Sequence, residues 1–211
     1  MASVSATPRC DLEKTTSAVL EGQGDVPTAP SVAGRERKWE LAYRSDLELT
    51  DAEDQRLRTL LVACFYYNPI FWFRRYYLER PAHRWIARNT ADEIVGHVAV
   101  HDKVVGSSQG DIRIGGLAEV CVTPSHRGLG ILKGMLQTVH EWMAARDYPF
   151  SMLYGQPHIY TSSGYSAIAN DVRASNSPLR WLVPRRGRPM IKALGALPWP
   201  KGRIDLRGPT F

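Results

Sequence analysis

The feature that most constrains this chain is residues 117–133, which read as a buried strand, a turn and the start of a helix. Thr123 and Pro124 open the turn, and Arg127 begins a glycine-rich stretch that leads into the helix. Apolar side chains then recur at steps of three and four residues, the spacing of a helix with one buried face. They are Leu132, Met135, Leu136, Val139 and Met143. The segment therefore predicts a helix that packs against a sheet directly after a buried strand.

The turn before this helix has the properties of a phosphate site. A helix N-terminus offers unpaired N–H groups and the positive end of the helix dipole, and glycine lets a phosphate approach the backbone closely. Two common nucleotide motifs are excluded. Gly128, Gly130 and Gly134 are spaced one residue too far for G-x-G-x-x-G, and no G-x-x-x-x-G-K-S/T is present. The turn therefore predicts a diphosphate-binding site of another type. The alternative is a turn that needs glycine only for its shape.

The stretch resembles the acyl-CoA-binding motif of the GNAT superfamily of N-acetyltransferases, Q/R-x-x-G-x-G/A after a strand that ends in valine. Arg127 and Gly130 match this motif, whereas Leu132 stands where the family has glycine or alanine. A second segment, residues 153–165, resembles the family's Y-x-x-x-G-F/Y motif. Its matching residues are Tyr160, Gly164 and Tyr165. A long helix and a strand separate the two motifs, as in the family, and the resemblance covers about residues 39–173.

The resemblance implies the GNAT fold, an α+β arrangement in α/β/α layers with a mixed, mostly antiparallel central sheet flanked by helices. The residues predict strands at 38–44, 83–88, 94–102, 150–153 and 166–173, and a further strand that starts within 104–116. Thr50 and Glu53 form a capping box at the start of a helix. Its apolar face is predicted to hold Leu57, Leu60, Leu61 and Cys64. A short helix is expected at Tyr160.

The resemblance implies acetyl-CoA as the acyl donor, and it implies no metal. In the family, the main chain of the central strand meets the acyl carbonyl and the pantetheine arm, and the turn holds the diphosphate. The candidate donor-binding residues are Val120, Cys121, Val122, Arg127, Gly128, Leu129, Gly130, Ile131 and Leu132. His97 and His101 do not indicate a metal site, because four residues along a strand separate their positions by about 13 Å.

Amide formation requires a base and a donor to the leaving group. A primary amine with a pKa of about 10 must lose a proton before or during its attack on a thioester. In the family, a carboxylate near the start of the central strand often serves as base, which makes Glu119 the candidate; a structural glutamate is the alternative. Tyr160 matches the family tyrosine that donates a hydrogen bond to the departing sulfur.

Cys121 is interpreted as a packing residue. It lacks an obvious paired base, and family members generally transfer the acyl group directly in a ternary complex. Strand alternation predicts that Glu119 and Cys121 share one face and that Val120 and Val122 share the other.

The acceptor is indicated only by weaker features. Residues 65–77 are rich in aromatic side chains, and in the GNAT fold this segment commonly forms a wall of the acceptor site. Such a wall suits a sugar ring, an aryl amine or an acyl chain; a second helix packed on the core is the alternative. Residues 39–49 and 197–209 resemble the ends of the nodulation protein A branch, N-acyltransferases of amino-sugar oligomers. Aminoglycoside 2′-N-acetyltransferases close with a comparable Trp-x-x-Gly element.

These features predict an N-acetyltransferase that moves an acetyl group from acetyl-CoA to a primary amine of a small molecule, an amino sugar or aminoglycoside-like compound. Two alternatives stay open. One is a nodulation protein A-like N-acyltransferase that takes a longer chain from CoA or from an acyl carrier protein. The other is a non-catalytic CoA-binding module.

Length and composition predict one acyltransferase domain at residues 38–211, since 211 residues that are 44% hydrophobic can build a sizeable core. Residues 1–37 are rich in Ser, Thr, Ala, Gly and Pro and predict a disordered leader. No apolar run approaches the roughly 20 residues of a membrane span, and the start lacks a secretory h-region. Three widely spaced cysteines add to the expectation of a reducing, cytoplasmic setting.

The positive charge is concentrated near the end of the chain, where residues 180–211 carry eight Lys or Arg against one acid. This basic segment would attract an acyl carrier protein, an anionic substrate or the CoA phosphates, and a solvated segment is the alternative. Nucleic acid is not favoured, because Arg74 and Arg75 among the aromatic residues lack a repeat of stacking platforms. A homodimer stays open.

Overall fold

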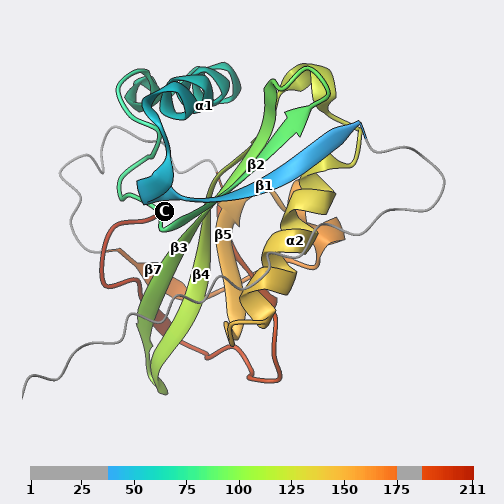
Figure 1. Cartoon of the computed structure of the whole chain (residues 1–211). Helices are drawn as coiled ribbons and strands as arrows, with labels where there is room; N and C mark the ends of the chain where they lie inside the picture. Colours follow the sequence, from blue (N-terminus) through green and yellow to red (C-terminus); the bar gives the residue numbers. More distant parts are fainter. Residues whose placement is uncertain (1–37, 175–186) are drawn as a thin grey trace, which may run out of the picture.

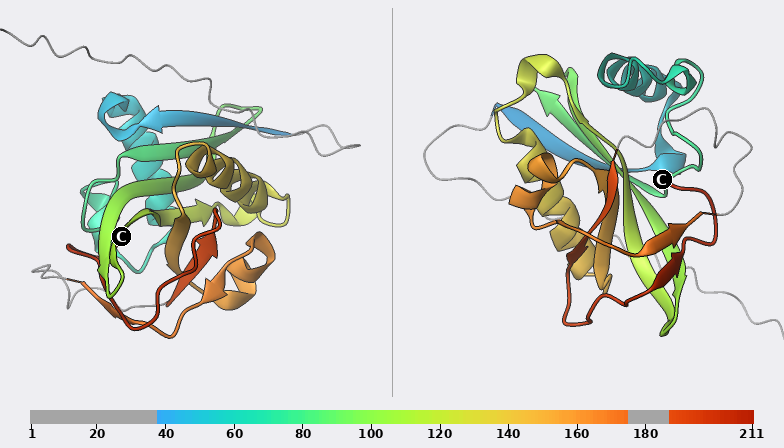
Figure 2. Two further views of the ribbon diagram at one scale, coloured as in Figure 1. Left: turned by 90° about the horizontal axis from the view of Figure 1, so that it is seen from below. Right: turned by 180° about the vertical axis from the view of Figure 1, so that it is seen from behind.

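A computed structural model describes residues 38–174 and 187–211, which build a mixed sheet with α1 and α2 on opposite faces (Figures 1 and 2). The leader predicted at 1–37 lies outside the described residues. The longer strands are β1 Trp39–Ser45, β2 His83–Asn89, β3 Ile94–Ser107, β4 Gly110–Val122, β5 Phe150–Gly155 and β8 Arg188–Ala193. The shorter strands are β6 Ser166–Ala167, β7 Asp171–Arg173 and β9 Arg203–Asp205. The helices are α1 Asp51–Cys64, α2 Ile131–Ala144 and α3 Pro157–Tyr160, and the 3-10 turns are η1 Asp46–Glu48, η2 Pro69–Trp72, η3 Pro124–His126 and η4 Thr161–Ser163.

The strands follow the order β1-β2-β3-β4-β5-β8-β6, with β9 beside β3 and β7 beside β9. Neighbours from β1 to β4 are antiparallel, whereas β4 and β5 are parallel. α2 connects these two, since parallel neighbours need a crossover connection. The predicted α+β fold with a mixed, mostly antiparallel sheet is confirmed, and so are the strands predicted at 38–44, 83–88, 94–102 and 150–153.

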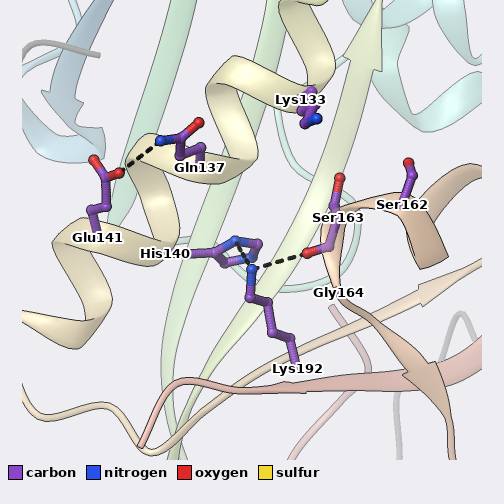
Figure 3. A pocket seen from close by; sticks show the side chains of 8 residues that line it. All are labelled: Lys133, Gln137, His140, Glu141, Ser162, Ser163, Gly164 and Lys192. Atoms are coloured by element: carbon purple, nitrogen blue, oxygen red, sulfur yellow. Dashed lines mark hydrogen bonds between the residues drawn. The ribbon is translucent and has the colours of Figure 1, made fainter. Parts of the chain in front are cut away.

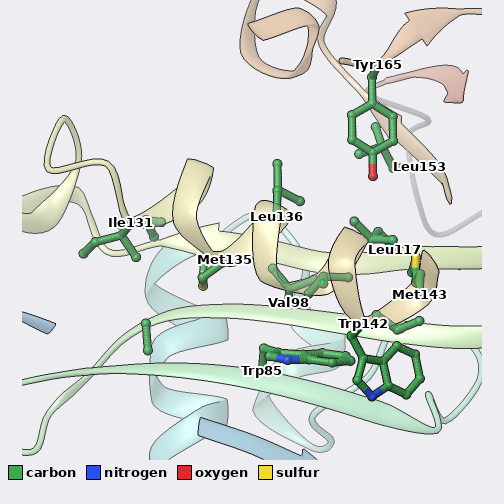
Figure 4. Close-up of a cluster of buried hydrophobic side chains, with 14 of the residues drawn as sticks. Trp85, Val98, Leu117, Ile131, Met135, Leu136, Trp142, Met143, Leu153 and Tyr165 are labelled. Carbon is green, nitrogen blue, oxygen red and sulfur yellow. The ribbon is translucent and has the colours of Figure 1, made fainter. Parts of the chain in front are cut away.

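The core on one face of the sheet is built around α2 (Figure 4). The predicted apolar stripe is confirmed, because four of its five members have no exposed surface and Leu132 is partly buried. Trp142 and Ile131 extend the stripe. The strands place Trp85, Val98 and Leu117 against it.

The opposite face carries α1, and its start is the predicted capping box. The N–H of Glu53 donates to the Thr50 hydroxyl at 3.3 Å, and the N–H of Thr50 donates to the Glu53 carboxylate at 3.2 Å. These bonds satisfy N–H groups that a helix start otherwise leaves unpaired. Leu57, Leu60 and Leu61 are buried beneath α1, as predicted.

The prediction of a single strand at 166–173 is wrong, because two short strands, β6 and β7, lie there. β6 pairs with β8, whereas β7 pairs with β9. Asn170 lies between them, and its amide donates to the carbonyls of Pro200 and Gly202 at 3.0 and 2.7 Å. Its side-chain oxygen accepts from the Trp199 indole at 2.9 Å. These contacts anchor the chain to the loop before β9 and divide the predicted strand.

The basic segment is not simply solvated where the structure describes it. Residues 187–211 contribute β8 and β9 to the sheet. Ile204, Leu206 and Phe211 are buried in a second core on the α1 face, next to Ala99 and Ala118. Arg180, Arg185 and Arg186 of this segment lie outside the described residues.

Gly134 gives a test of how α2 sits on the sheet. A Cβ at this position would lie 2.6 Å from the Trp39 ring. Alanine in an exposed helix stabilises by about 1 kcal/mol relative to glycine, whereas overpacking costs about 1–3 kcal/mol. We expect Gly134→Ala to lower the free energy of unfolding in urea, and to raise it in a Trp39→Leu background. A stabilising effect in both backgrounds would contradict the close contact.

Candidate active site

Strand β4 contains a β-bulge at Glu119. His97 of β3 pairs with Cys121 and Ala99 pairs with Ala118, so one residue of β3 faces two residues of β4. Glu119 has a φ of 46°, a left-handed conformation that costs roughly 1–3 kcal/mol for a residue other than glycine. The extra residue changes which way the side chains point. Ala118 and Glu119 both turn to the α1 face, where one packs on the second core and the other contacts Tyr77.

The alternation predicted beyond the bulge is confirmed. Val120 and Val122 pack on the α2 core, whereas Cys121 is buried in the cluster under α1. Glu119 and Cys121 therefore share the α1 face.

The parallel strands β4 and β5 separate at the bulge. Their pairing runs from Ile114 with Phe150 to Leu117 with Leu153 and ends there, although both strands continue. Residues 118–122 keep β3 as a neighbour but make no ladder with β5 among the described residues. Apart from the Val122 carbonyl, which accepts from Arg127, their main-chain groups on that edge are open to a ligand, which would give them the partners that buried backbone groups need.

Glu119 is a buried carboxyl with one partner. Its Oε1 accepts from the N–H of Tyr77 at 2.9 Å, while its Oε2 is buried and has no hydrogen-bond partner among the described residues. Burial raises the pKa of Glu119 to about 7, and the nearby cations Arg84 and Arg74 limit the rise. A carboxyl with this pKa is present in both protonation states near neutrality, which suits a general base.

Tyr160 ends α3, directly after β5, and its ring lies against Gly155. A Cβ at Gly155 would lie 2.4 Å from that ring, so the close approach needs glycine. Burial, then Cys121 and Tyr67, raise the pKa of Tyr160 to about 12, which keeps the phenol protonated. Cys121 also interacts electrostatically with Glu119. Glu119 and Tyr160 therefore both lie within electrostatic range of Cys121.

The Cys121 thiol is buried, and burial raises its pKa well above the usual value. A protonated thiol is a poor nucleophile, in agreement with the packing interpretation. Its neighbour is Cys64 at the end of α1, whose pKa is lowered by its hydrogen bond to Cys121 and by Arg127. The sequence did not indicate this pair, because 57 residues separate its members.

The glycine-rich turn is shaped for close approach. Gly128 and Gly130 have φ values of 78° and 77°, and a Cβ at either position would meet nothing within 4 Å. Gly130 is the N-cap of α2, and within residues 38–174 and 187–211 no side chain caps the first turn. Arg127 folds back so that its Nε donates to the Val122 carbonyl at 3.2 Å. The turn joins the end of β4 to an open helix N-terminus.

The other residues predicted to bind the acyl donor differ in how exposed their side chains are. The Ile131 side chain is buried in the α2 core, so only its main chain can face a ligand, and Leu132 is partly buried there. Leu129 is exposed. The departure from the family motif at Leu132 therefore leaves the space beside Gly128 and Gly130 open.

A pocket of about 440 Å³ lies between α2, η4 and β8 and begins at the first turn of α2 (Figure 3). It is lined by Lys133, Gln137, His140, Glu141, Ser162, Ser163, Gly164 and Lys192. The Lys192 ammonium donates to the Ser163 carbonyl at 3.0 Å and to His140 Nδ1 at 3.1 Å. Burial lowers the pKa of His140 to about 3, so this ring stays neutral and accepts. The pocket thus holds a lysine in a fixed position.

Sequence reasoning placed Lys192 only within the basic segment. In the structure Gly164 has a φ of 88°, and a Cβ there would lie 3.3 Å from the Lys192 side chain, so glycine leaves room for the lysine. Figure 3 shows that the lysine reaches across from β8 to the helix.

The aromatic segment at 65–77 forms neither a second helix nor a uniform wall. η2 is a single 3-10 turn, and Phe71 is buried under α1. Tyr67 lies near Tyr160 and the main chain of Tyr77 holds Glu119, so the segment does reach the site. Its most exposed side chains are Tyr66, Trp72 and Phe73.

Two further expectations concern metals and membranes. His97 and His101 share a face of β3, and the described residues hold no group of three or more His, Cys, Asp or Glu that could bind a metal ion. Within the same residues, every helix is too short or too polar to cross a bilayer.

A family model described as an acetyltransferase (GNAT) domain matches residues 47–168. A search of curated proteins finds no match. Among solved structures, the GNAT family N-acetyltransferase YhbS of Escherichia coli in complex with CoA is similar, with a TM-score of 0.59 and 14% identity over 84% of this chain and 94% of that one.

An acyl-CoA N-acyltransferase of Pseudomonas aeruginosa is also similar, with a TM-score of 0.51 and 15% identity over 74% of this chain and 99% of that one. At these identities the structural likeness shows a shared fold. The family match covers more than half of the chain and includes the bulge, the glycine-rich turn and α2. The chain therefore belongs to the GNAT family of acetyltransferases.

Proposed function

We propose that this protein transfers an acetyl group from acetyl-CoA to a primary amine of a small molecule. The observation that carries the proposal is the arrangement around β4. There, main-chain groups free of β5, a buried carboxyl and an open helix N-terminus lie along one continuous segment.

The donor fits this segment from its acyl end to its nucleotide end. The main chain of Val120, Cys121 and Val122 would meet the acyl carbonyl and the pantetheine arm. The first turn of α2, opened by Gly128 and Gly130, would hold the diphosphate, because unpaired N–H groups and the helix dipole favour anions. Arg127 adds a positive charge beside it.

The pocket along α2 supports CoA as the form of the donor. CoA carries a 3′-phosphate beyond its diphosphate, and the fixed ammonium of Lys192 lies along α2 from the diphosphate seat. A phosphopantetheine arm on a carrier protein has no such group. Lys133, in the first turn of α2, adds a second cation to the lining.

We derive catalysis from one deprotonated group, the Glu119 carboxylate, and one protonated group, the Tyr160 phenol. The Glu119 carboxylate takes a proton from the amine as its nitrogen bonds to the thioester carbon. The carbon–sulfur bond then breaks, and the Tyr160 hydroxyl donates a hydrogen bond to the departing thiolate. The pKa of Tyr160, about 12, exceeds the usual thiol value of about 8.5. The hydroxyl therefore stabilises the thiolate by a hydrogen bond without full proton transfer.

An amino sugar or aminoglycoside-like amine is the acceptor class that the sequence favours. The resemblance of residues 39–49 and 197–209 to the nodulation protein A branch supports it. Tyr67, which lies near Tyr160, gives the site an aromatic neighbour that can contact a sugar ring.

The first prediction concerns turnover. Thiol release from acetyl-CoA should depend on an amine drawn from aminoglycosides, amino sugars, polyamines and peptides. We expect Tyr160→Phe to lower kcat by about 100-fold, because it removes a donor to developing charge. We expect kcat/KM to rise with a midpoint of about pH 7 as Glu119 ionises, and to rise again toward about pH 10 as the amine loses its own proton.

Tyr148→Phe is the matched control, because burial also raises the pKa of Tyr148 to about 12 but this residue precedes β5, at the other end of the strand. It should keep wild-type kcat. Turnover of long-chain acyl-CoA or of an acyl carrier protein, without turnover of acetyl-CoA, would contradict acetyl-CoA as the donor and would show that the enzyme transfers a longer acyl chain. CoA binding with no turnover on any donor would favour a binding module.

The second prediction concerns the nucleotide end, measured by calorimetry. The wild type should bind CoA about tenfold more tightly than dephospho-CoA, the increment of one charge-assisted hydrogen bond. Lys192→Met should reduce this ratio to below threefold, whereas Lys201→Met, at an exposed loop residue, should preserve it. Arg127→Glu should abolish binding of both ligands. An unchanged ratio in Lys192→Met would show that the 3′-phosphate lies elsewhere.

A further inference from the structure

Behind Glu119 lies a line of buried polar side chains that the transfer reaction does not use. Asp46 of η1, Arg84 of β2 and His97 of β3 are at most 1% exposed. Arg84 pairs with the Asp46 carboxylate through its Nε, and its Nη1 donates to His97 Nε2 at 2.9 Å. His97 Nδ1 lies 2.9 Å from the main-chain carbonyl of Glu119.

The chemistry of these groups fixes the positions of their protons. A guanidinium can only donate, so His97 Nε2 must accept. The proton of the neutral ring then lies on Nδ1, which donates to the Glu119 carbonyl. Burial and the Arg84 charge lower the pKa of His97 to about 3, so the ring remains neutral. Hydrogen-bond donation therefore runs outward from Arg84, to Asp46 on one side and through His97 to the bulge on the other.

The bulge explains why the Glu119 carbonyl needs this donor. The extra residue of a β-bulge has no partner across the ladder. A buried carbonyl without a partner costs about 1–3 kcal/mol, and the left-handed φ of Glu119 adds strain. The imidazole of His97 replaces the missing ladder bond, and it does so from the strand that faces the bulge.

We propose that Asp46, Arg84 and His97 form a positioning chain that holds the β4 bulge and so keeps the Glu119 carboxyl against the Tyr77 amide. The proposal rests on the assignment of Glu119 as the base. None of the three residues touches the reacting atoms in this scheme; they act through the conformation and the charge environment of Glu119.

Two members of this positioning chain also affect the pKa of the Glu119 carboxyl. Arg84 lowers the pKa of Glu119 and Asp46 raises it, against the larger effect of burial. The other groups that face Glu119 are Arg74 and the Tyr77 amide before β2, the neutral His97 on β3 and the protonated Cys121 on β4. Loss of Arg84 removes a nearby cation, which should raise the pKa of Glu119.

The Tyr77 amide gives a readout that needs no acceptor. It donates to Glu119 Oε1, so its proton chemical shift should follow the ionisation of Glu119, with a midpoint of about pH 7 in the wild type. Spectra of ¹⁵N-labelled protein across pH would record it, and Glu119→Gln should abolish the titration and identify it.

We expect Arg84→Met to raise this midpoint by about one pH unit, since removal of an opposite charge shifts a pKa by at least that much. Arg84→Lys should keep it within half a unit, as the charge remains. His97→Leu should uncouple the Tyr77 amide from the titration, because the bulge loses its donor. His97→Asn should retain the coupling, because its amide nitrogen can take the place of Nδ1.

A wild-type midpoint in folded Arg84→Met, or a wild-type titration of Tyr77 in His97→Leu, would overturn the positioning chain. Thermal unfolding checks each variant. If His97→Leu does not fold, the titration of Arg84→Met decides. This variant should fold, because Asp46 remains paired with Arg75 at 2.7 Å and with Arg80 at 3.4 Å. Turnover by Glu119→Gln at the wild-type rate would refute the base assignment while the titration results stand, so the two failures are distinct.

Discussion

The bulge in β4 is the constraint on which the site depends. One extra residue turns the Glu119 side chain from the α2 core to the α1 face, and the ladder between β4 and β5 ends just before it. The same irregularity therefore places a carboxyl and releases main-chain groups for a ligand. A strand that kept the alternation of residues 110–118 would point Glu119 toward the α2 core, opposite to Ala118, and would offer β5 the groups that a pantetheine arm needs.

This arrangement requires polar groups in the interior, and each is balanced differently. Asp46 is surrounded by arginines, and its pKa is lowered by hydrogen bonds and charges from Arg75 and Arg84 despite burial. Glu119 has one hydrogen-bond partner among the described residues, and its pKa is about 7 against a usual 4.5. The folded state thus holds this proton more tightly than the unfolded chain. Its contribution to stability is complete below pH 4.5 and is lost as the pH rises through 7. The burial that raises the pKa of Glu119 and makes it a base near neutrality therefore also lowers the stability of the fold above pH 7.

Local patterns predicted the parts of the fold that local energetics determine. The stripe of α2, the Thr50 capping box and the glycine-rich turn depend on neighbours within a few residues, and all three are present. The bulge was not predictable, because Glu119 fits an ordinary strand until His97, 22 residues away, is known to satisfy its carbonyl. The roles of Lys192 and Asp46 were not predicted either, since their partners lie 52 and 38 residues away. The division of residues 166–173 followed from contacts of Asn170 with a loop 30 residues further on.

Titration of ¹⁵N-labelled protein with CoA tests the donor seat most directly. We expect the largest amide shift changes at residues 120–122 and 128–133, with smaller changes along the α2 pocket at Ser163 and Gly164. β1 and β2, which lie on the far side of β3, should change little. Saturable shifts confined to those two strands, with none at the glycine-rich turn, would contradict the placement of the donor between β4, β5 and the N-terminus of α2.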